Sequence, residues 1–264
     1  MKSTIRFILT QIFRNQHVNE KLCLFFFRAV RAYYSNVLIQ KYHRVLGGAY
    51  EGLKVPQIAN HQNFTYVQIT GMYEAFIQQI IDKKLSHHKK FIDIGCGCGH
   101  YTNGIAYKYH IPTLGVDLDP KQIEMANSIA KLNNLKDATH VAAQPGYDAT
   151  EYLEDKALHL MDIEGGEWIV MEQMDPKNYK KASFLIELHK FGEKTVADTK
   201  AMIEKKFAKT HKITQLTEDF QRTDKGEEVY ALIRDAGVPR QFSYMLLTEP
   251  RDYYQSWLLV EPTK

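Results

Sequence analysis

Short apolar runs alternate with helical patterns along most of the chain, and this alternation constrains the fold more than any other feature. Seven runs have the length and composition of buried strands, at residues 91–94, 113–116, 139–143, 157–161, 183–188, 212–216 and 257–260. Helical patterns lie between most of them, at residues 101–109, 120–132, 167–174 and 194–207. This order predicts an α/β fold with an open, mainly parallel seven-stranded sheet and helices on both faces.

Composition excludes several other classes of protein. The chain has 264 residues, of which 44% are hydrophobic and 25% are charged, as in an ordinary globular protein and unlike collagen or a disordered chain. Three cysteines are too few for an extracellular disulfide framework. The sequence contains no stretch of about 18 uncharged apolar residues, so we expect no membrane-spanning helix. We therefore expect a cytoplasmic protein.

Charge is distributed unevenly. Residues 1–46 hold eight basic residues and one acidic residue, a net charge of +7, whereas the remaining 218 residues hold 26 basic and 30 acidic residues. A basic end on a mildly acidic body favours an anionic partner, which can be a membrane surface, a nucleic acid or a phosphorylated glycan carrier. No separate nucleic-acid-binding module is visible in the sequence, so we do not expect a nucleic acid to be the partner.

The same basic segment predicts two amphipathic helices. The first follows the apolar residues of 5–13, and the second those of 22–37, with Asn19 as its N-cap and Gly47-Gly48 as its stop. They can contact a membrane peripherally, cover the main domain, or form a homodimer contact.

The predicted domain organisation follows from these patterns. Residues 1–65 form a basic helical extension and connector, and residues 66–264 form the main domain. A helical pattern covers 66–86, and residues 218–256 are an insertion before the last strand.

A glycine-rich turn follows the first predicted strand. The sequence Phe91-Ile-Asp-Ile-Gly95-Cys-Gly97-Cys-Gly99 ends a strand and opens a helix, and Asp117 ends the next strand. Glycines at alternate positions let the backbone approach a ligand, and a carboxylate at the second strand end can accept hydrogen bonds from two ribose hydroxyls. A nucleotide-containing cofactor is therefore expected.

The charge of Asp93 distinguishes two classes of cofactor. A dinucleotide site uses GxGxxG and places a pyrophosphate on the helix N-terminus, but here the third glycine comes one residue early. Asp93 repels a pyrophosphate and attracts a cationic amino acid group. This favours S-adenosylmethionine, which carries an ammonium and a sulfonium.

The stretches FIDIGCGCGHYTNGIA and LGVDLDPKQIEMANSIAKLNNL resemble the first two motifs of class I S-adenosylmethionine-dependent methyltransferases, which have a Rossmann-like fold. The resemblance implies that Asp93 meets the cofactor ammonium, and that Gly95, Cys96 and Gly97 shape the loop under its methionine tail. It also implies a role in nucleoside binding for three more residues: Asp117 on the ribose, Leu118 beside the adenine, and Gln144, which replaces the acidic residue that often contacts the adenine amino group.

The fourth and fifth strands end in acidic residues and a histidine. In an open α/β sheet, ligands lie beyond the carboxyl ends of the strands. The resemblance to methyltransferases implies that the first, fourth and fifth strands are neighbours, so Asp162, Glu164 and His189 are expected to converge beside the methyl donor, with Glu187 deeper. The sequences DIEGGEW and IELH resemble FkbM-type methyltransferases. That resemblance implies O-methylation of a sugar hydroxyl or a related small or lipid-linked acceptor.

The candidate catalytic residues are His189, Asp162 and Glu164. Transfer to a hydroxyl needs alignment and a base, and an unperturbed imidazole titrates near neutral pH. Asp162 or Glu164 can instead hold the hydroxyl, orient His189 or take the proton. We expect no metal; the alternative is a hard divalent cation such as Mg²⁺ on Asp162, Glu164 and Glu187.

Two other functions stay open at this stage. One is an RNA methyltransferase that uses the basic N-terminal arm. The other is a cofactor-binding or membrane-associated protein that has lost catalysis.

Overall fold

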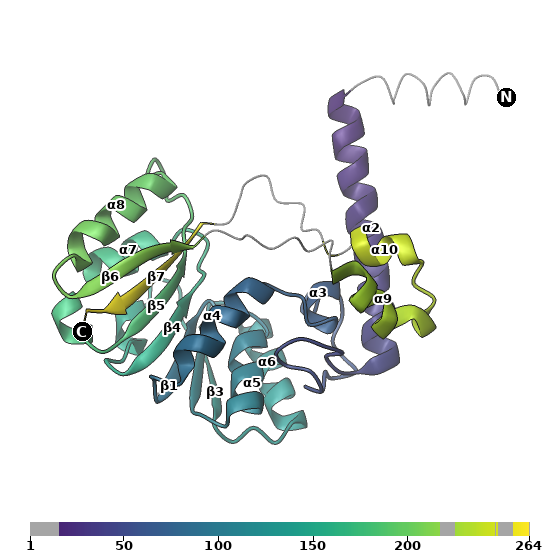
Figure 1. The fold of residues 1–264 in the computed structure, drawn as a ribbon, viewed down its shortest axis with the longest axis horizontal. Coiled ribbons are helices and arrows are strands. Elements are labelled where there is room, and N and C mark those ends of the chain that lie inside the picture. The colour runs from purple at the N-terminus through teal and green to yellow at the C-terminus, as the bar shows by residue number, and fades with distance from the viewer. Residues whose placement is uncertain (1–15, 217–224, 246, 248–255, 264) are drawn as a thin grey trace.

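The fold is seen in a computed structural model of the chain, which describes residues 16–216, 225–245, 247 and 256–263 (Figure 1). Its strands are β1 (Lys90–Ile94), β2 (Thr113–Asp117), β3 (Ala138–Ala142), β4 (Ala157–Met161), β5 (Ser183–Glu187), β6 (His211–Leu216) and β7 (Trp257–Pro262). The helices are α2 (Gln16–Tyr42), α3 (Tyr66–Ile69), α4 (Ala75–Leu85), α5 (His100–Tyr109), α6 (Pro120–Leu132), α7 (Glu167–Gln173), α8 (Val196–Phe207), α9 (Gly226–Ile233) and α10 (Arg240–Met245). Short 3-10 helices are η1 (Ala149–Tyr152), η2 (Pro176–Tyr179) and η4 (Arg234–Ala236).

The seven strands form one mixed sheet in the order β3-β2-β1-β4-β5-β7-β6. The first five strands along the chain are parallel to one another, and β7 pairs antiparallel with both β5 and β6. The α/β prediction and all seven strand positions are confirmed. The parallel sheet is interrupted only by β7, which enters the sheet from the opposite direction between β5 and β6.

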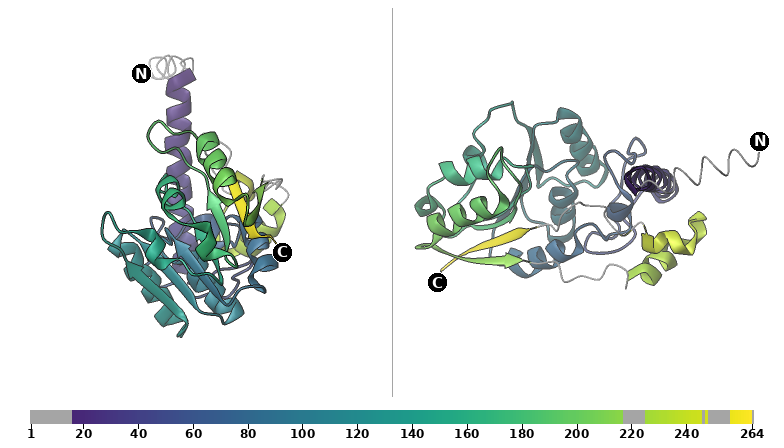
Figure 2. Two further views of the ribbon diagram at one scale, coloured as in Figure 1. Left: turned by 90° about the vertical axis from the view of Figure 1, so that its left-hand side faces the viewer. Right: turned by 90° about the horizontal axis from the view of Figure 1, so that it is seen from above.

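Helices cover both faces of the sheet (Figure 2). On one face, apolar residues of α4, α5 and α6 pack with alternate strand residues such as Phe91, Leu158 and Leu185. On the other face, α7 and α8 pack with the intervening strand residues. Because strand side chains alternate between faces, Asp93 points to the same face as Phe91, towards α4 and α5.

The second N-terminal helix is present as α2, but its predicted ends were wrong. The helix already includes Gln16, so Asn19 lies inside it and does not cap it. It ends at Tyr42, before Gly47 and Gly48. Gly48 instead allows a close backbone contact, because a Cβ there would lie 2.2 Å from the carbonyl oxygen of Gly71. The first predicted helix lies outside the described residues.

The same backbone crossing divides the helical pattern of residues 66–86. Gly71 has a φ of +78°, and a Cβ on it would lie 1.8 Å from the carbonyl oxygen of Gly47. The chain turns there, so α3 and α4 replace the single predicted helix, and Glu74 precedes α4 with a φ of 42°. Apolar spacing alone did not reveal this break.

The described part of the predicted insertion packs on the N-terminal helix. Asp235 of η4 accepts a hydrogen bond from the Tyr42 hydroxyl and forms an ion pair with Lys41 at 3.3 Å. The rings of Tyr34 and Phe242 lie 5.5 Å apart. Two segments distant in sequence thus form one helical group beside the sheet. Within the described residues, no helix is long and apolar enough to cross a membrane.

Candidate active site

The glycine turn after β1 brings the ends of β1 and β4 into direct backbone contact. Gly95 has a φ of +90°, and a Cβ on it would lie 2.0 Å from the carbonyl oxygen of Asp162. Gly97 also has a positive φ, of +51°, but a Cβ there would meet nothing within 4 Å. The turn is therefore closed against β4 at Gly95 and open to a ligand at Gly97.

The carboxylate of Asp117 lies beside the open part of this turn. One of its oxygens accepts a hydrogen bond from the Gly97 N–H at 2.8 Å, and the other accepts one from the Asp119 N–H at 2.8 Å. Each oxygen keeps a second lone pair for a ligand hydroxyl. The side chain is thus fixed in place before any ligand arrives.

Leu118 and Gln144 lie close to Asp117 along the chain or across the sheet edge. Leu118 follows Asp117 and is 53% exposed, which is high for a leucine. The Ala143 N–H donates to the Asp117 carbonyl at 2.9 Å, so Gln144, an exposed residue, comes next to the same strand end. An exposed leucine and an exposed glutamine are therefore next to the strand end that carries Asp117.

Cys96 contributes its backbone to the turn and turns its side chain inward. The thiol is buried, and its sulfur would lie 2.8 Å from a Cβ on Gly115 of β2. Burial, followed by the charges of Asp93 and Asp117, raises the pKa of the thiol well above its usual value. Cys96 thus remains a protonated packing residue under the loop.

Asp93 is the most deeply buried acid of the turn. Its side chain is almost fully buried, and one carboxylate oxygen has no hydrogen-bond partner among the described residues. Burial raises its pKa well above the usual value, and the charges of Asp162, Asp117 and Glu74 add to this shift. Because a buried carboxylate without a partner is costly, the position favours a cationic ligand group.

The predicted convergence at the ends of β4 and β5 is confirmed. The imidazole Nε2 of His189 lies 3.6 Å from Glu164, 3.7 Å from Glu187 and 3.9 Å from Asp162. Glu187 is buried, deeper than the exposed Glu164, as the strand register predicted.

These acids shift the pKa of His189 upward. Burial alone lowers it, but the hydrogen bond to Glu167 and the charges of Glu167, Glu187 and Asp162 outweigh burial and raise the pKa to about 9. The imidazole is therefore protonated near neutral pH.

The pKa of Asp162 shifts upward, towards neutral pH, which suits a proton acceptor. Burial and the charge of Glu187 raise its pKa to about 7, with smaller contributions from Glu164 and Glu167, against the lowering effect of His189. One oxygen of Asp162 has no hydrogen-bond partner among the described residues.

Glu167 was not among the predicted site residues, but the structure gives it contacts with them. It is fully buried, and one oxygen lies 2.9 Å from His189 Nδ1. Its carboxylate also accepts hydrogen bonds from the N–H groups of Ile163 at 3.0 Å and Gly165 at 2.9 Å. It ties the loop after β4 to the histidine after β5. The signal was its spacing of three residues after Glu164, in front of a helix.

Glu74 was missed entirely. It is buried in front of α4, and the hydroxyl of Tyr101 donates to it at 2.7 Å. Glu74 and Glu164 both adopt positive φ values, of 42° and 51°. Non-glycine residues rarely take this conformation, and where they do, a functional site is often nearby.

Two groups of these residues bring ligand atoms within 4.8 Å of one another. One is Asp162, Glu164 and His189, and the other is Glu74, Asp162 and Glu187. Their oxygen-rich composition suits a hard cation. The set named for the alternative with a metal, Asp162, Glu164 and Glu187, is divided between two groups that share Asp162.

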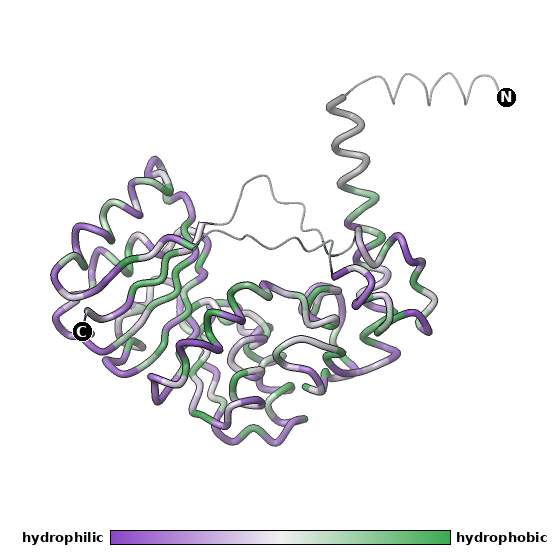
Figure 3. The backbone as a smooth tube through the Cα atoms, in the orientation of Figure 1, coloured by the Kyte–Doolittle hydropathy of each residue, from purple (hydrophilic) through white to green (hydrophobic). Residues whose placement is uncertain are grey.

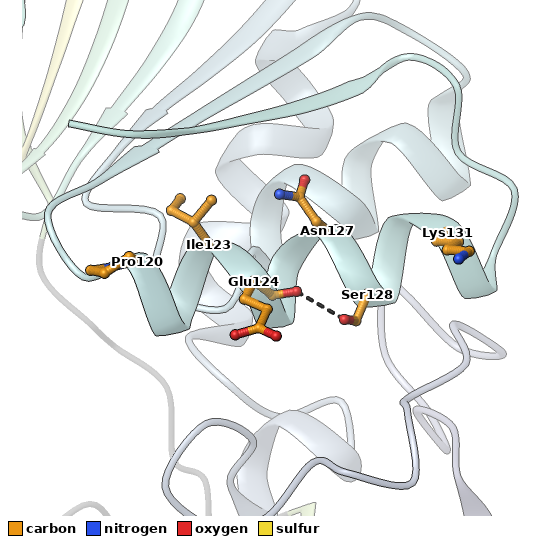
Figure 4. Close-up of a pocket in the computed structure, with 6 residues that line it drawn as sticks. All are labelled: Pro120, Ile123, Glu124, Asn127, Ser128 and Lys131. Carbon is orange, nitrogen blue, oxygen red and sulfur yellow. Dashed lines mark hydrogen bonds between the residues drawn. The ribbon is translucent and has the colours of Figure 1, made fainter.

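A surface hollow of about 410 Å³ lies along α6 and does not coincide with this site (Figure 4). All its lining residues come from α6: Pro120, Ile123, Glu124, Asn127, Ser128 and Lys131. None of them is among the candidate site residues.

A family model described as a methyltransferase domain matches residues 85–159. The matched segment runs from the end of α4 to β4 and includes the glycine turn, Asp93 and Asp117. This match supports an S-adenosylmethionine-dependent methyltransferase.

Solved methyltransferase structures resemble this domain. The METTL16 MTase domain aligns with a TM-score of 0.50 at 13% identity, over 85% of this chain and 75% of that one, which shows a shared fold. Precorrin-6y C5,15-methyltransferase from Geobacter metallireducens aligns with a TM-score of 0.49 at 10% identity, over 79% and 98%. An O-methyltransferase from Bacillus cereus in complex with SAH gives 0.46 at 12%, over 71% and 79%. No curated protein sequence matches the chain significantly.

The residues of the methyltransferase site fit its cofactor, S-adenosylmethionine. The unpartnered oxygen of Asp93 suits an ammonium group. Gly97 leaves open space beside the fixed carboxylate of Asp117, which suits a ribose. The ends of β1 and β2 thus offer a cationic nucleoside both acidic groups and open space.

We predict that two glycine substitutions in the glycine turn after β1 lower the free energy of unfolding by different amounts. Gly97→Ala lowers the free energy of unfolding by about 1–2 kcal/mol, the cost of a left-handed alanine. Gly95→Ala costs more than about 3 kcal/mol, because its Cβ also meets the Asp162 carbonyl. Urea denaturation measures both values, and equal costs would contradict the backbone contact.

Proposed function

We propose that this methyltransferase transfers a methyl group to a hydroxyl of a sugar, a glycolipid or a related small acceptor. The observation that carries the proposal is the position of Asp162 at the end of β4, where its carboxylate lies 3.9 Å from His189 Nε2. Burial and the charge of Glu187 raise the pKa of Asp162 to about 7. A hydroxyl is a poor nucleophile until it loses its proton, and a base that titrates near neutral pH serves that purpose best. The FkbM-type pattern supports the same acceptor class.

The cofactor roles are part of the proposal. Asp93 holds the ammonium of S-adenosylmethionine, and the loop of Gly95, Cys96 and Gly97 lies under the methionine tail. Asp117 binds the ribose hydroxyls. In the same way, Leu118 flanks the adenine, and the amide of Gln144 accepts a hydrogen bond from the adenine amino group.

The chemistry divides between the cofactor and the chain. When bound, S-adenosylmethionine supplies an electrophilic methyl group on a sulfonium that leaves readily. Asp162 takes the proton of the acceptor hydroxyl, and the imidazolium of His189 stabilises the developing negative charge on its oxygen. Glu164, which is exposed, orients the acceptor at the mouth of the site.

The carboxylates around the reacting position also limit the acceptor. Glu74, Asp162, Glu164 and Glu187 lie close enough to repel phosphates next to the reacting hydroxyl. A neutral, hydroxyl-rich acceptor avoids this repulsion and can donate hydrogen bonds to the same groups. This supports a sugar over an RNA acceptor.

The ribose assignment predicts that Asp117→Ala weakens binding of S-adenosylmethionine by about tenfold to a hundredfold, since hydrogen bonds to a charged group contribute about 1.5–3 kcal/mol. Isothermal titration calorimetry measures the affinity. Asp137→Ala, at an exposed position before β3, is the matched control and leaves it unchanged. Equal affinities for Asp117→Ala and the parent would remove Asp117 from the cofactor site.

The proton-transfer assignment predicts a bell-shaped pH profile of kcat/KM. Activity rises as Asp162 loses its proton near pH 7 and falls as His189 loses its proton near pH 9. Asp162→Asn lowers kcat by about 10²–10⁴. A methyl-transfer assay with labelled cofactor and a panel of glycosides measures both, and an Asp162→Asn variant with full turnover would refute this role.

Glu167 acts on the reaction through His189, and its variant has a distinct signature. Glu167→Gln removes the main interaction that raises the pKa of His189, so the basic limb of the profile moves to lower pH. Glu172→Gln, exposed on the same helix, leaves the limb in place. A general loss of stability would lower activity at every pH without moving the limb.

A further inference from the structure

The N-terminal helix α2 has two halves with opposite surroundings. In its C-terminal half, Leu38 and Ile39 are fully buried in the core beside α3. In its N-terminal half, Phe25 is 73% exposed and Phe26 is 64% exposed, and Tyr33, just past the midpoint, is 63% exposed. The N-terminal half extends away from the sheet and beyond α9 and α10 (Figures 1 and 2).

The exposed aromatic residues lie on neighbouring sides of the helix. Phe26 and Tyr33 are seven residues apart, which is about two turns and places them on one side, and Phe25 lies about 100° around the helix from Phe26. We call these three residues the aromatic stripe. Figure 3 shows hydrophobic colour where α2 rises above α10. Large apolar side chains gathered in this way mark an interaction surface.

The charge around the aromatic stripe indicates the kind of surface it meets. Arg28 is exposed between its members, and residues 1–46 carry a net charge of +7. A second copy of the chain would place two such segments together, and they would repel each other. A single-stranded RNA can stack its bases on the rings, but the remaining 218 residues are net acidic, and the acids around the reacting position would repel its phosphates. An anionic lipid surface satisfies both, with headgroups for the basic residues and acyl chains for the rings.

We propose that the aromatic stripe inserts into the interface of an anionic lipid bilayer, with the basic residues around it on the headgroups. The C-terminal half of α2 is fixed in the core, so the helix holds the methyltransferase domain at the membrane surface. The proposal does not depend on the identity of the acceptor.

The test is co-sedimentation of the full chain with phosphatidylcholine vesicles that contain or lack phosphatidylglycerol. The parent binds the anionic vesicles, and added salt weakens binding. The double variant F25S/F26S binds at least about tenfold more weakly, because it removes two large apolar side chains. Leu132→Ser, which alters a 41% exposed leucine at the end of α6, is the matched control and binds as the parent does.

A charge variant tests the second part of the proposal. Arg28→Gln weakens binding to anionic vesicles, whereas Lys136→Gln, an exposed lysine between α6 and β3, does not. Unchanged cofactor affinity and thermal melting show that each variant is folded.

Three results would overturn the proposal: no binding of the parent to anionic vesicles, equal binding of the parent and F25S/F26S, or an RNA affinity that F25S/F26S loses. A fourth is a parent dimer in analytical ultracentrifugation that F25S/F26S converts to monomer, which would assign the stripe to a second copy of the chain.

Discussion

The contact on which the site depends is between two backbones. Gly95 approaches the Asp162 carbonyl so closely that no side chain fits between them, and the Asp162 N–H donates to the Ile94 carbonyl at 3.1 Å. The ends of β1 and β4 are therefore held together. This contact places Asp93, on one strand, next to Asp162, which follows the other. A looser turn would move Asp93, which suits the cofactor ammonium, away from Asp162, which suits the role of proton acceptor.

The second constraint is electrostatic. Several carboxylates meet on one face of the sheet, and burial makes their mutual repulsion costly. Burial, together with this repulsion, raises the pKa of Asp162 to about 7. Attraction to the same carboxylates, above all to Glu167, outweighs burial and raises the pKa of His189 to about 9. The carboxylates also prepare the site for a cofactor that carries a sulfonium and an ammonium. The same field thus serves binding and, in the function we propose, catalysis.

Much of this arrangement could be predicted from the sequence. Buried strands are continuous apolar runs, so their positions follow from composition, and the ends of neighbouring parallel strands meet by geometry, which predicts that Asp162 and His189 converge. The antiparallel entry of β7 depends on which edge the last segment reaches, and a local pattern carries no such information. Glu74 was hidden because the break at Gly71 arises from a contact with Gly47, far away in the chain. The contacts of Glu167 depend on the loop geometry after β4, which residue spacing does not specify.

The central claim is that the turn at Gly95, with acids at both sides, holds a cationic nucleoside. The most direct measurement is a crystal structure of the protein with S-adenosylhomocysteine. We expect the ribose hydroxyls within hydrogen-bond distance of the Asp117 carboxylate, and the ammonium near the unpartnered oxygen of Asp93. A ligand bound elsewhere, or a turn whose open side at Gly97 is filled by side chains, would contradict the account.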